Sequence, residues 1–127
     1  MSNLRADFDD QVLINDIASI AKNVSDELDI LQGKKILFTG GAGFLGYEFL
    51  HLLAQVGDSD GRAMIDLTIY ENFSRGRKPW LDHLSARQNV ALEEHDITNP
   101  LPCDTPKFDY IVLFAPINLT SRLFELE

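Results

Sequence analysis

The sequence predicts an α/β fold built on a parallel sheet. Short apolar runs of the length of buried strands alternate along the chain with segments whose apolar residues recur every three to four positions. The chain has 127 residues, a length that suits one domain. Strands that alternate with helices run parallel, and the helices then cover both faces of the sheet.

Four strands and two intervening helices are expected after residue 34. A glycine-rich turn follows the first strand, and a helix with a regular apolar face follows that turn. Proline at position 79 suits the first turn of a short second helix. The expected strands lie at 35–39, 64–70, 90–94 and 109–115, and the expected helices at 44–56 and 79–84.

Residues 1–33 precede the first strand and form an acidic arm. Positions 1–32 hold seven acidic residues and two basic ones. Apolar residues recur at helical spacing from Phe8 to Val24, which predicts an amphipathic helix. Ser25 could cap a second, shorter helix that ends at Gly33. The arm either covers an edge of its own domain or contacts another chain, and the sequence leaves both readings open.

Composition excludes several classes of function. The formal charge of −9 argues against a dedicated binder of nucleic acid or anionic membranes, because phosphate groups need a basic surface. The single cysteine, Cys103, excludes an internal disulfide and fits a reducing compartment. No apolar run approaches the ~20 residues of a membrane helix, and the first residues lack the layout of a secretory signal. We therefore expect a cytoplasmic protein with no membrane or nucleic-acid partner.

The segment 39–46, TGGAGFLG, is the most informative part of the chain. It follows a predicted strand and opens a predicted helix, the context in which glycine spacing predicts a dinucleotide site. Gly40 would allow the tight turn, Gly43 the close approach of a pyrophosphate, and Gly46 the close packing of helix and sheet. The N-terminus of the helix would then face the phosphates. The alternative is a structural turn that binds nothing.

Glu71, at the end of the second strand, supplies the acidic residue that binds the ribose hydroxyls of NAD in such sites. Its carboxylate would repel the 2′-phosphate of NADP, so NAD is favoured. Arg75 offers a partner for that phosphate, which keeps NADP open as the alternative cofactor. Glu71 could otherwise be an ordinary solvated strand end.

These segments together resemble the extended short-chain dehydrogenases/reductases, which include NAD-dependent epimerases, dehydratases and decarboxylases of nucleotide sugars. TGGAGFLG resembles their T-G-x-x-G-x-x-G signature, and YENFSRG resembles the end of their second strand, with Glu71 in place of the usual Asp. Four motifs in the family's order cover residues 34 to about 116. The run HDITNPL is most similar to UDP-glucuronate decarboxylases and dTDP-glucose 4,6-dehydratases.

The resemblance implies a Rossmann-like doubly wound sheet, here with about four strands in the order 3-2-1-4. It also implies that Asp96 binds the adenine amino group and that Ile97 contacts adenine. Leu113 replaces the family's histidine and Pro116 its final small residue, which makes the nicotinamide end of the site atypical. The expected cofactor-binding residues are Gly40, Gly43, Phe44, Leu45, Gly46, Glu71, Asn72, Ser74, Arg75, Asp96, Ile97, Phe114 and Ala115.

No catalytic residue is assigned. The family's base is a tyrosine with a lysine four positions later, whereas the residues four after Tyr47, Tyr70 and Tyr110 are histidine, serine and phenylalanine. No cysteine and histidine spacing is typical of zinc, so no metal site is expected. His51 is expected on the surface of its helix.

We therefore interpret residues 34–116 as an NAD-binding Rossmann half-domain with the arm at 1–33 and a tail at 117–127. At family level it is the N-terminal part of an enzyme acting on a nucleotide sugar, and this chain alone is expected to be inactive. The alternatives are a non-catalytic NAD-binding regulatory module and a truncated product without activity. An exposed fourth strand predicts a homo-oligomer or pairing with a separate C-terminal part.

Overall fold

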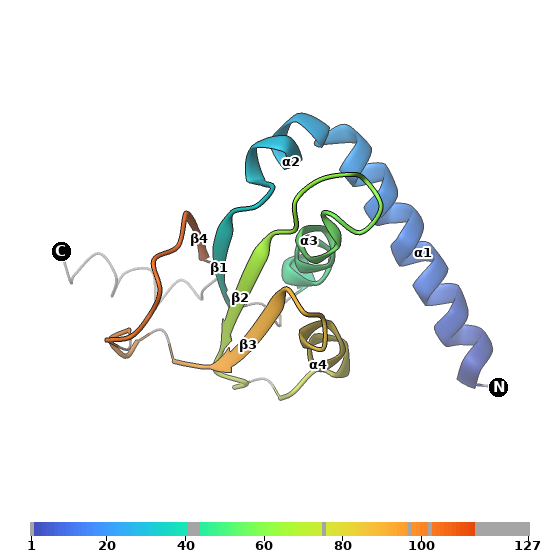
Figure 1. The fold of residues 1–127 in the computed structure, drawn as a ribbon. Coiled ribbons are helices and arrows are strands. Elements are labelled where there is room, and N and C mark those ends of the chain that lie inside the picture. Colours follow the sequence, from blue (N-terminus) through green and yellow to red (C-terminus); the bar gives the residue numbers. More distant parts are fainter. Residues whose placement is uncertain (1, 41–43, 75, 97, 102, 114–127) are drawn as a thin grey trace.

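A computed structural model of the protein describes residues 2–40, 44–74, 76–96, 98–101 and 103–113 (Figure 1). Four parallel strands form one sheet in the order β3-β2-β1-β4, flanked by helices, which confirms the predicted fold class and strand order. The elements are α1 (Ser2–Asn23), α2 (Ser25–Leu31), β1 (Lys35–Thr39), α3 (Phe44–Gln55), β2 (Asp66–Glu71), α4 (Pro79–Ser85), β3 (Val90–Glu94) and β4 (Tyr110–Leu113).

Strand β1 lies inside the sheet, with β2 on one side and β4 on the other. Thr39, its last residue, pairs with Tyr70 of β2 and with Leu113 of β4. Glu71 in turn pairs with Glu94, the last residue of β3. Because all four strands are parallel, their carboxyl ends meet at one edge of the sheet.

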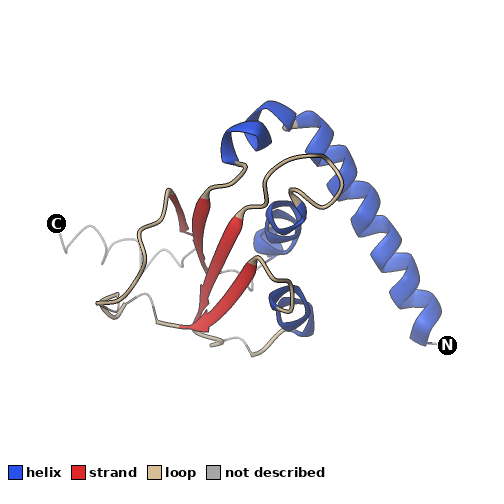
Figure 2. Cartoon of the chain, in the orientation of Figure 1, coloured by secondary structure: helices blue, strands red, loops and turns tan. Residues whose placement is uncertain are grey.

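The main core lies between one face of the sheet and helices α3 and α4, which occupy the same side of the strands (Figure 2). Phe38 at the centre of this face has no exposed surface. Both predicted intervening helices lie on this one side, so the expected helical cover of both faces is not found among the described residues. The buried residues of this core in the strands and these helices are Ile36, Phe38, Leu50, Leu52, Leu53, Ala54, Leu67, Ile69, Leu81, Leu84 and Val90.

The arm is packed against this core. Ile17 of α1 and Leu28 of α2 are 5% and 2% exposed and belong to the same buried cluster as the strands. Figure 1 shows α1 running past α3 toward the N-terminus. The apolar stripe predicted from the sequence therefore faces the chain's own domain over this stretch, whereas Val12 and Ile14 are exposed.

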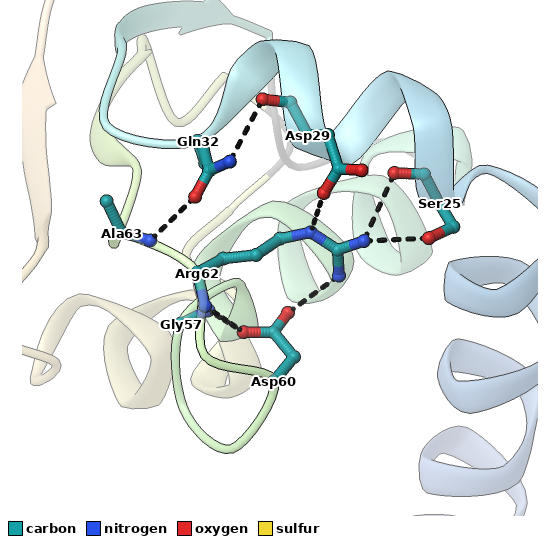
Figure 3. A network of polar contacts seen from close by, with 7 residues as sticks. All are labelled: Ser25, Asp29, Gln32, Gly57, Asp60, Arg62 and Ala63. Carbon is teal, nitrogen blue, oxygen red and sulfur yellow. Dashed lines mark hydrogen bonds and ion pairs between the residues drawn. The ribbon is translucent and has the colours of Figure 1, made fainter.

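Arg62 ties α2 to the loop that precedes β2 (Figure 3). Its Nε donates to Asp29 Oδ1 at 2.7 Å, and its Nη1 donates to Asp60 Oδ2 at 3.0 Å. Its Nη2 donates to the hydroxyl of Ser25 at 2.8 Å. The prediction that Ser25 caps α2 is thus wrong: Val24 occupies the cap position, and the Ser25 hydroxyl is engaged by Arg62 instead.

Asp60 makes the loop sensitive to acid. The pKa of its carboxyl group lies below the ordinary value, chiefly because the backbone N–H of Arg62 donates to the carboxylate, with further donors in the Arg62 side chain and the Gly57 N–H. A carboxyl group whose pKa is lower in the folded than in the unfolded chain stabilises the fold above its unfolded pKa. That contribution is lost as the pH falls through the folded pKa.

We therefore expect acid to lower the urea midpoint, and D60N to lower it at pH 7 while reducing the further loss between about pH 6 and pH 3. The effect should be small, because the ion pair is partly exposed. D104N, which removes another exposed carboxylate, is the matched control. Equal acid losses in the unmodified chain and in D60N would contradict this assignment.

Candidate functional site

Three predicted motifs meet at the carboxyl edge of the sheet. The backbone N–H of Gly40, which follows β1, donates to the carbonyl of Tyr70 at 3.0 Å. The N–H of His95, which follows β3, donates to the carbonyl of Glu71 at the same distance. The start of the glycine turn, the acidic end of β2 and the segment leading to Asp96 are therefore held side by side.

The glycine turn begins where the sheet order reverses. From β1 the chain reaches β2 on one side and, later, β4 on the other, and in open α/β sheets ligands bind outside the strands at such a point. Gly40 has a φ of +76°, a left-handed conformation that glycine adopts without strain. Helix α3 starts at Phe44, four positions after Gly40, so the positive end of its dipole lies on the same side of the sheet edge as the start of the turn.

Other residues of the predicted motif are only partly described. Gly46 is buried within α3, as expected for a position of close packing. For Phe44 and Leu45 the helix backbone is described and the side chains are not. Gly43 lies outside the described residues.

Glu71 is a buried carboxylate, with only 7% of the residue exposed. Its Oε1 accepts a hydrogen bond from the backbone N–H of Phe73 at 3.2 Å. It is therefore not the solvated strand end that remained an alternative from the sequence. A carboxylate is kept at a buried position when hydrogen-bond donors are aimed at it, and further donors from a ligand's hydroxyl groups are chemically suited to it.

The loop after β2 is fixed by its own hydrogen bonds. The side-chain oxygen of Asn72 accepts from the N–H of Ser74 at 3.0 Å. The N–H of Gly76 donates to the carbonyl of Phe73 at 2.9 Å, and Phe73 has a φ of 59°. Asn72 and Ser74 are exposed beside Glu71, whereas Arg75 lies outside the described residues.

Asp96 is exposed at the end of the third strand segment. Its Oδ1 accepts from the backbone N–H of Thr98 at 2.9 Å and from the Thr98 hydroxyl at 2.7 Å. These bonds fix the direction of the carboxylate at the edge where adenine is expected. Ile97, Phe114 and Ala115 lie outside the described residues.

Arg77 is a cation of this corner that the sequence interpretation missed. Its Nε lies 2.9 and 3.1 Å from the two carboxylate oxygens of Asp82, and its guanidinium carbon lies 4.5 Å from the ring centre of Phe73. Hydrogen bonding to Asp82 is the main reason why the pKa of Arg77 is raised, and the charge of Glu94 adds to it. The sequence contains arginines at 75 and 77, and no local pattern in it indicates that Arg77 pairs with Asp82.

The side chain of His51 departs from expectation. His51 is not on the surface but 9% exposed, because α4 covers this side of α3 and places Trp80 near the imidazole, with ring centres 5.5 Å apart. The His51 Nδ1 donates to the carbonyl of Tyr47 at 2.6 Å. His95 packs against Tyr70, with ring centres 5.0 Å apart, on the face of the sheet opposite Phe38.

Within the described ranges, no three His, Cys, Asp or Glu side chains are close enough to hold a metal ion. In the same part of the chain, no helix is both long and apolar enough to cross a membrane.

Sequence comparison then bears on the family. No protein-family model matches the sequence. A curated protein of Danio rerio named UDP-glucuronic acid decarboxylase 1 is 38% identical over 68 residues, and its Xenopus tropicalis namesake has the same identity over the same length. A UDP-glucuronic acid decarboxylase 1 of Arabidopsis thaliana is 34% identical over 67 residues.

The chain is similar to UDP-glucuronic acid decarboxylases. The matches confirm the predicted resemblance to epimerase/dehydratase-type enzymes, since the relatives carry the name of one of the subgroups that the motifs indicated. The matched segments cover 54%, 54% and 53% of this chain but only 15%, 14% and 14% of the three relatives. The similarity therefore concerns a small part of a UDP-glucuronic acid decarboxylase.

Proposed function

We propose that this chain binds NAD at the carboxyl edge of its sheet, as the cofactor-binding N-terminal part of a nucleotide-sugar decarboxylase, epimerase or dehydratase. The observation that carries the proposal is the buried carboxylate of Glu71, held beside the glycine turn where the strand order reverses. The similarity to UDP-glucuronic acid decarboxylases supports the same class.

The residues present fit NAD chemically. The turn at Gly40 and the N-terminus of α3 suit a pyrophosphate, and Glu71 suits the two hydroxyls of the adenosine ribose. Asp96 suits the exocyclic amino group of adenine. The hydroxyl of Thr39 is buried at the end of β1 without a partner among the described residues, so this edge retains a polar group for a ligand or water to satisfy.

Bound NAD would supply the acceptor of a hydride from the sugar. In this chain the residues of the edge would bind and orient the adenosine half of the cofactor, and NAD is favoured over NADP by the carboxylate of Glu71. UDP-glucuronic acid, the compound in the relatives' name, is the proposed substrate of the whole enzyme. The chain contains no tyrosine with a lysine four positions later, so binding without turnover is proposed for it alone.

Association is also part of the proposal. Strand β4 is an edge of the described sheet, and its Ile111 and Leu113 are 56% and 49% exposed. An exposed apolar edge strand can pair with another chain, either a second copy or a separate C-terminal part. A cytoplasmic location belongs to the proposal as well, supported by the single cysteine.

Calorimetry with NAD tests the cofactor. We expect one NAD to bind per chain, and E71Q to raise the Kd about tenfold or more, because hydrogen bonds from ribose hydroxyls to a charged acceptor are stronger than those to an amide. E93Q is the matched control, since Glu93 is exposed on the other face of the sheet. No binding to the folded, unmodified chain would leave only the alternative of a product without a cofactor site. Conversion of UDP-glucuronic acid by this chain alone would contradict the expected inactivity.

A further inference from the structure

We propose that Asp82 sets the preference for NAD over NADP by occupying Arg77, a cation of the loop after β2 that could otherwise bind a 2′-phosphate. This inference rests on the proposed NAD site and goes beyond it, because Asp82 is a positioning residue on another element, in the first turn of α4.

Asp82 holds Arg77 through several bonds at once. The guanidinium Nε contacts both carboxylate oxygens, and Nη2 lies 2.8 Å from Oδ1. Asp82 thus occupies the side of the guanidinium on which the Nε and Nη2 N–H groups point in the same direction. Two phosphate oxygens would bind to the same side. A 2′-phosphate would therefore have to compete with a carboxylate that belongs to the same chain.

Arg77 is also fixed in place from a second direction. Its guanidinium stacks over Phe73, two residues beyond Glu71, at 4.5 Å from the ring centre. The Phe73 N–H is bonded to the Glu71 carboxylate, so the stacked pair is connected directly to the predicted ribose-binding residue. Loss of Asp82 would thus free the donors of Arg77 without removing the contact that keeps the guanidinium at this corner.

The acidic side chains around Arg77 make the local charge unfavourable to the binding of a phosphate group. Glu94 is close enough for its charge to act on Arg77, and it pairs in register with Glu71. Three carboxylates therefore lie in this region, those of Glu71, Glu94 and Asp82. The cation described in contact with Phe73 is Arg77. Neutralising Asp82 both lowers the repulsion of a 2′-phosphate and releases a bidentate partner for it.

The test compares Kd for NAD and for NADP by calorimetry in the unmodified chain, D82N, R77A and the D82N/R77A double variant. D82N should lower the Kd of NADP about tenfold relative to that of NAD, as one charge-assisted contact would. The double variant should lose that gain. The gain in D82N should also shrink from about 50 to 500 mM salt, because it is electrostatic.

E93Q is the matched control, since it removes one negative charge from an exposed residue on the opposite face of the sheet. An equal gain in NADP affinity in E93Q would assign the effect to net charge and overturn the proposal. An unchanged affinity ratio in D82N that still binds NAD would also overturn it, as would a gain that persists in the double variant. If the folded chain binds neither cofactor, the proposed NAD function fails first and this inference falls with it.

Discussion

Replacing Phe38 with alanine is expected to lower the free energy of unfolding by about 3–5 kcal/mol. Phe38 has no exposed surface and lies on β1, which pairs with a neighbouring strand on both sides. Its removal takes away buried apolar area and leaves a cavity between the sheet and α3, where surrounding strands cannot collapse freely. Domains of this size are stable by about 5–15 kcal/mol, so this single change would remove a large share of the total.

Urea denaturation followed by circular dichroism measures the effect. I111A is the matched control, because Ile111 lies on the edge strand with 56% of its surface exposed and its truncation should change stability by only about 0.5 kcal/mol. Similar losses in F38A and I111A would contradict the assignment of the core to the α3 face of β1.

Replacing Leu28 with alanine is expected to destabilise the whole domain by about 2–5 kcal/mol. Leu28 lies in the acidic arm, yet it is 2% exposed and belongs to the same buried cluster as the strands. Its effect should appear in a single unfolding transition, because the arm and the sheet share one core.

The arm supplies its own control. Ile30, in the same helix, is 62% exposed, and I30A should leave the unfolding midpoint almost unchanged. If L28A instead unfolds the arm alone and leaves the sheet at its original midpoint, the arm is a separate unit. That outcome would support the alternative interpretation, in which residues 1–33 contact another chain.

Local pattern was sufficient to predict the strands, and the family resemblance predicted their order. The apolar runs predicted β1 at 35–39 and β3 at 90–94 with the observed bounds. Strand β2 begins two residues later than predicted, at Asp66, because the preceding backbone turns toward the arm, where the Ala63 carbonyl accepts from the Gly33 N–H. The described part of β4 lies within the predicted 109–115.

Contacts between residues that lie far apart along the chain could not be predicted from the sequence. Ser25 is engaged by Arg62, 37 positions away, and no local signal distinguishes that bond from helix capping. The burial of Glu71 depends on how the next loop folds back, and the burial of His51 depends on where α4 lies. The pairing of Arg77 with Asp82 spans only five positions, but it crosses from a loop into a helix and so escapes any periodic pattern.

Trp80 gives the molecule a built-in optical reporter. It is the chain's single tryptophan, and its ring meets that of Tyr47, in the first turn of α3, edge-on with centres 4.9 Å apart. Its indole emission, including energy transferred from Tyr47, therefore depends on the contact between α4 and the start of α3. Any event that moves the helix following the glycine turn relative to α4 is visible in the fluorescence of the unlabelled protein.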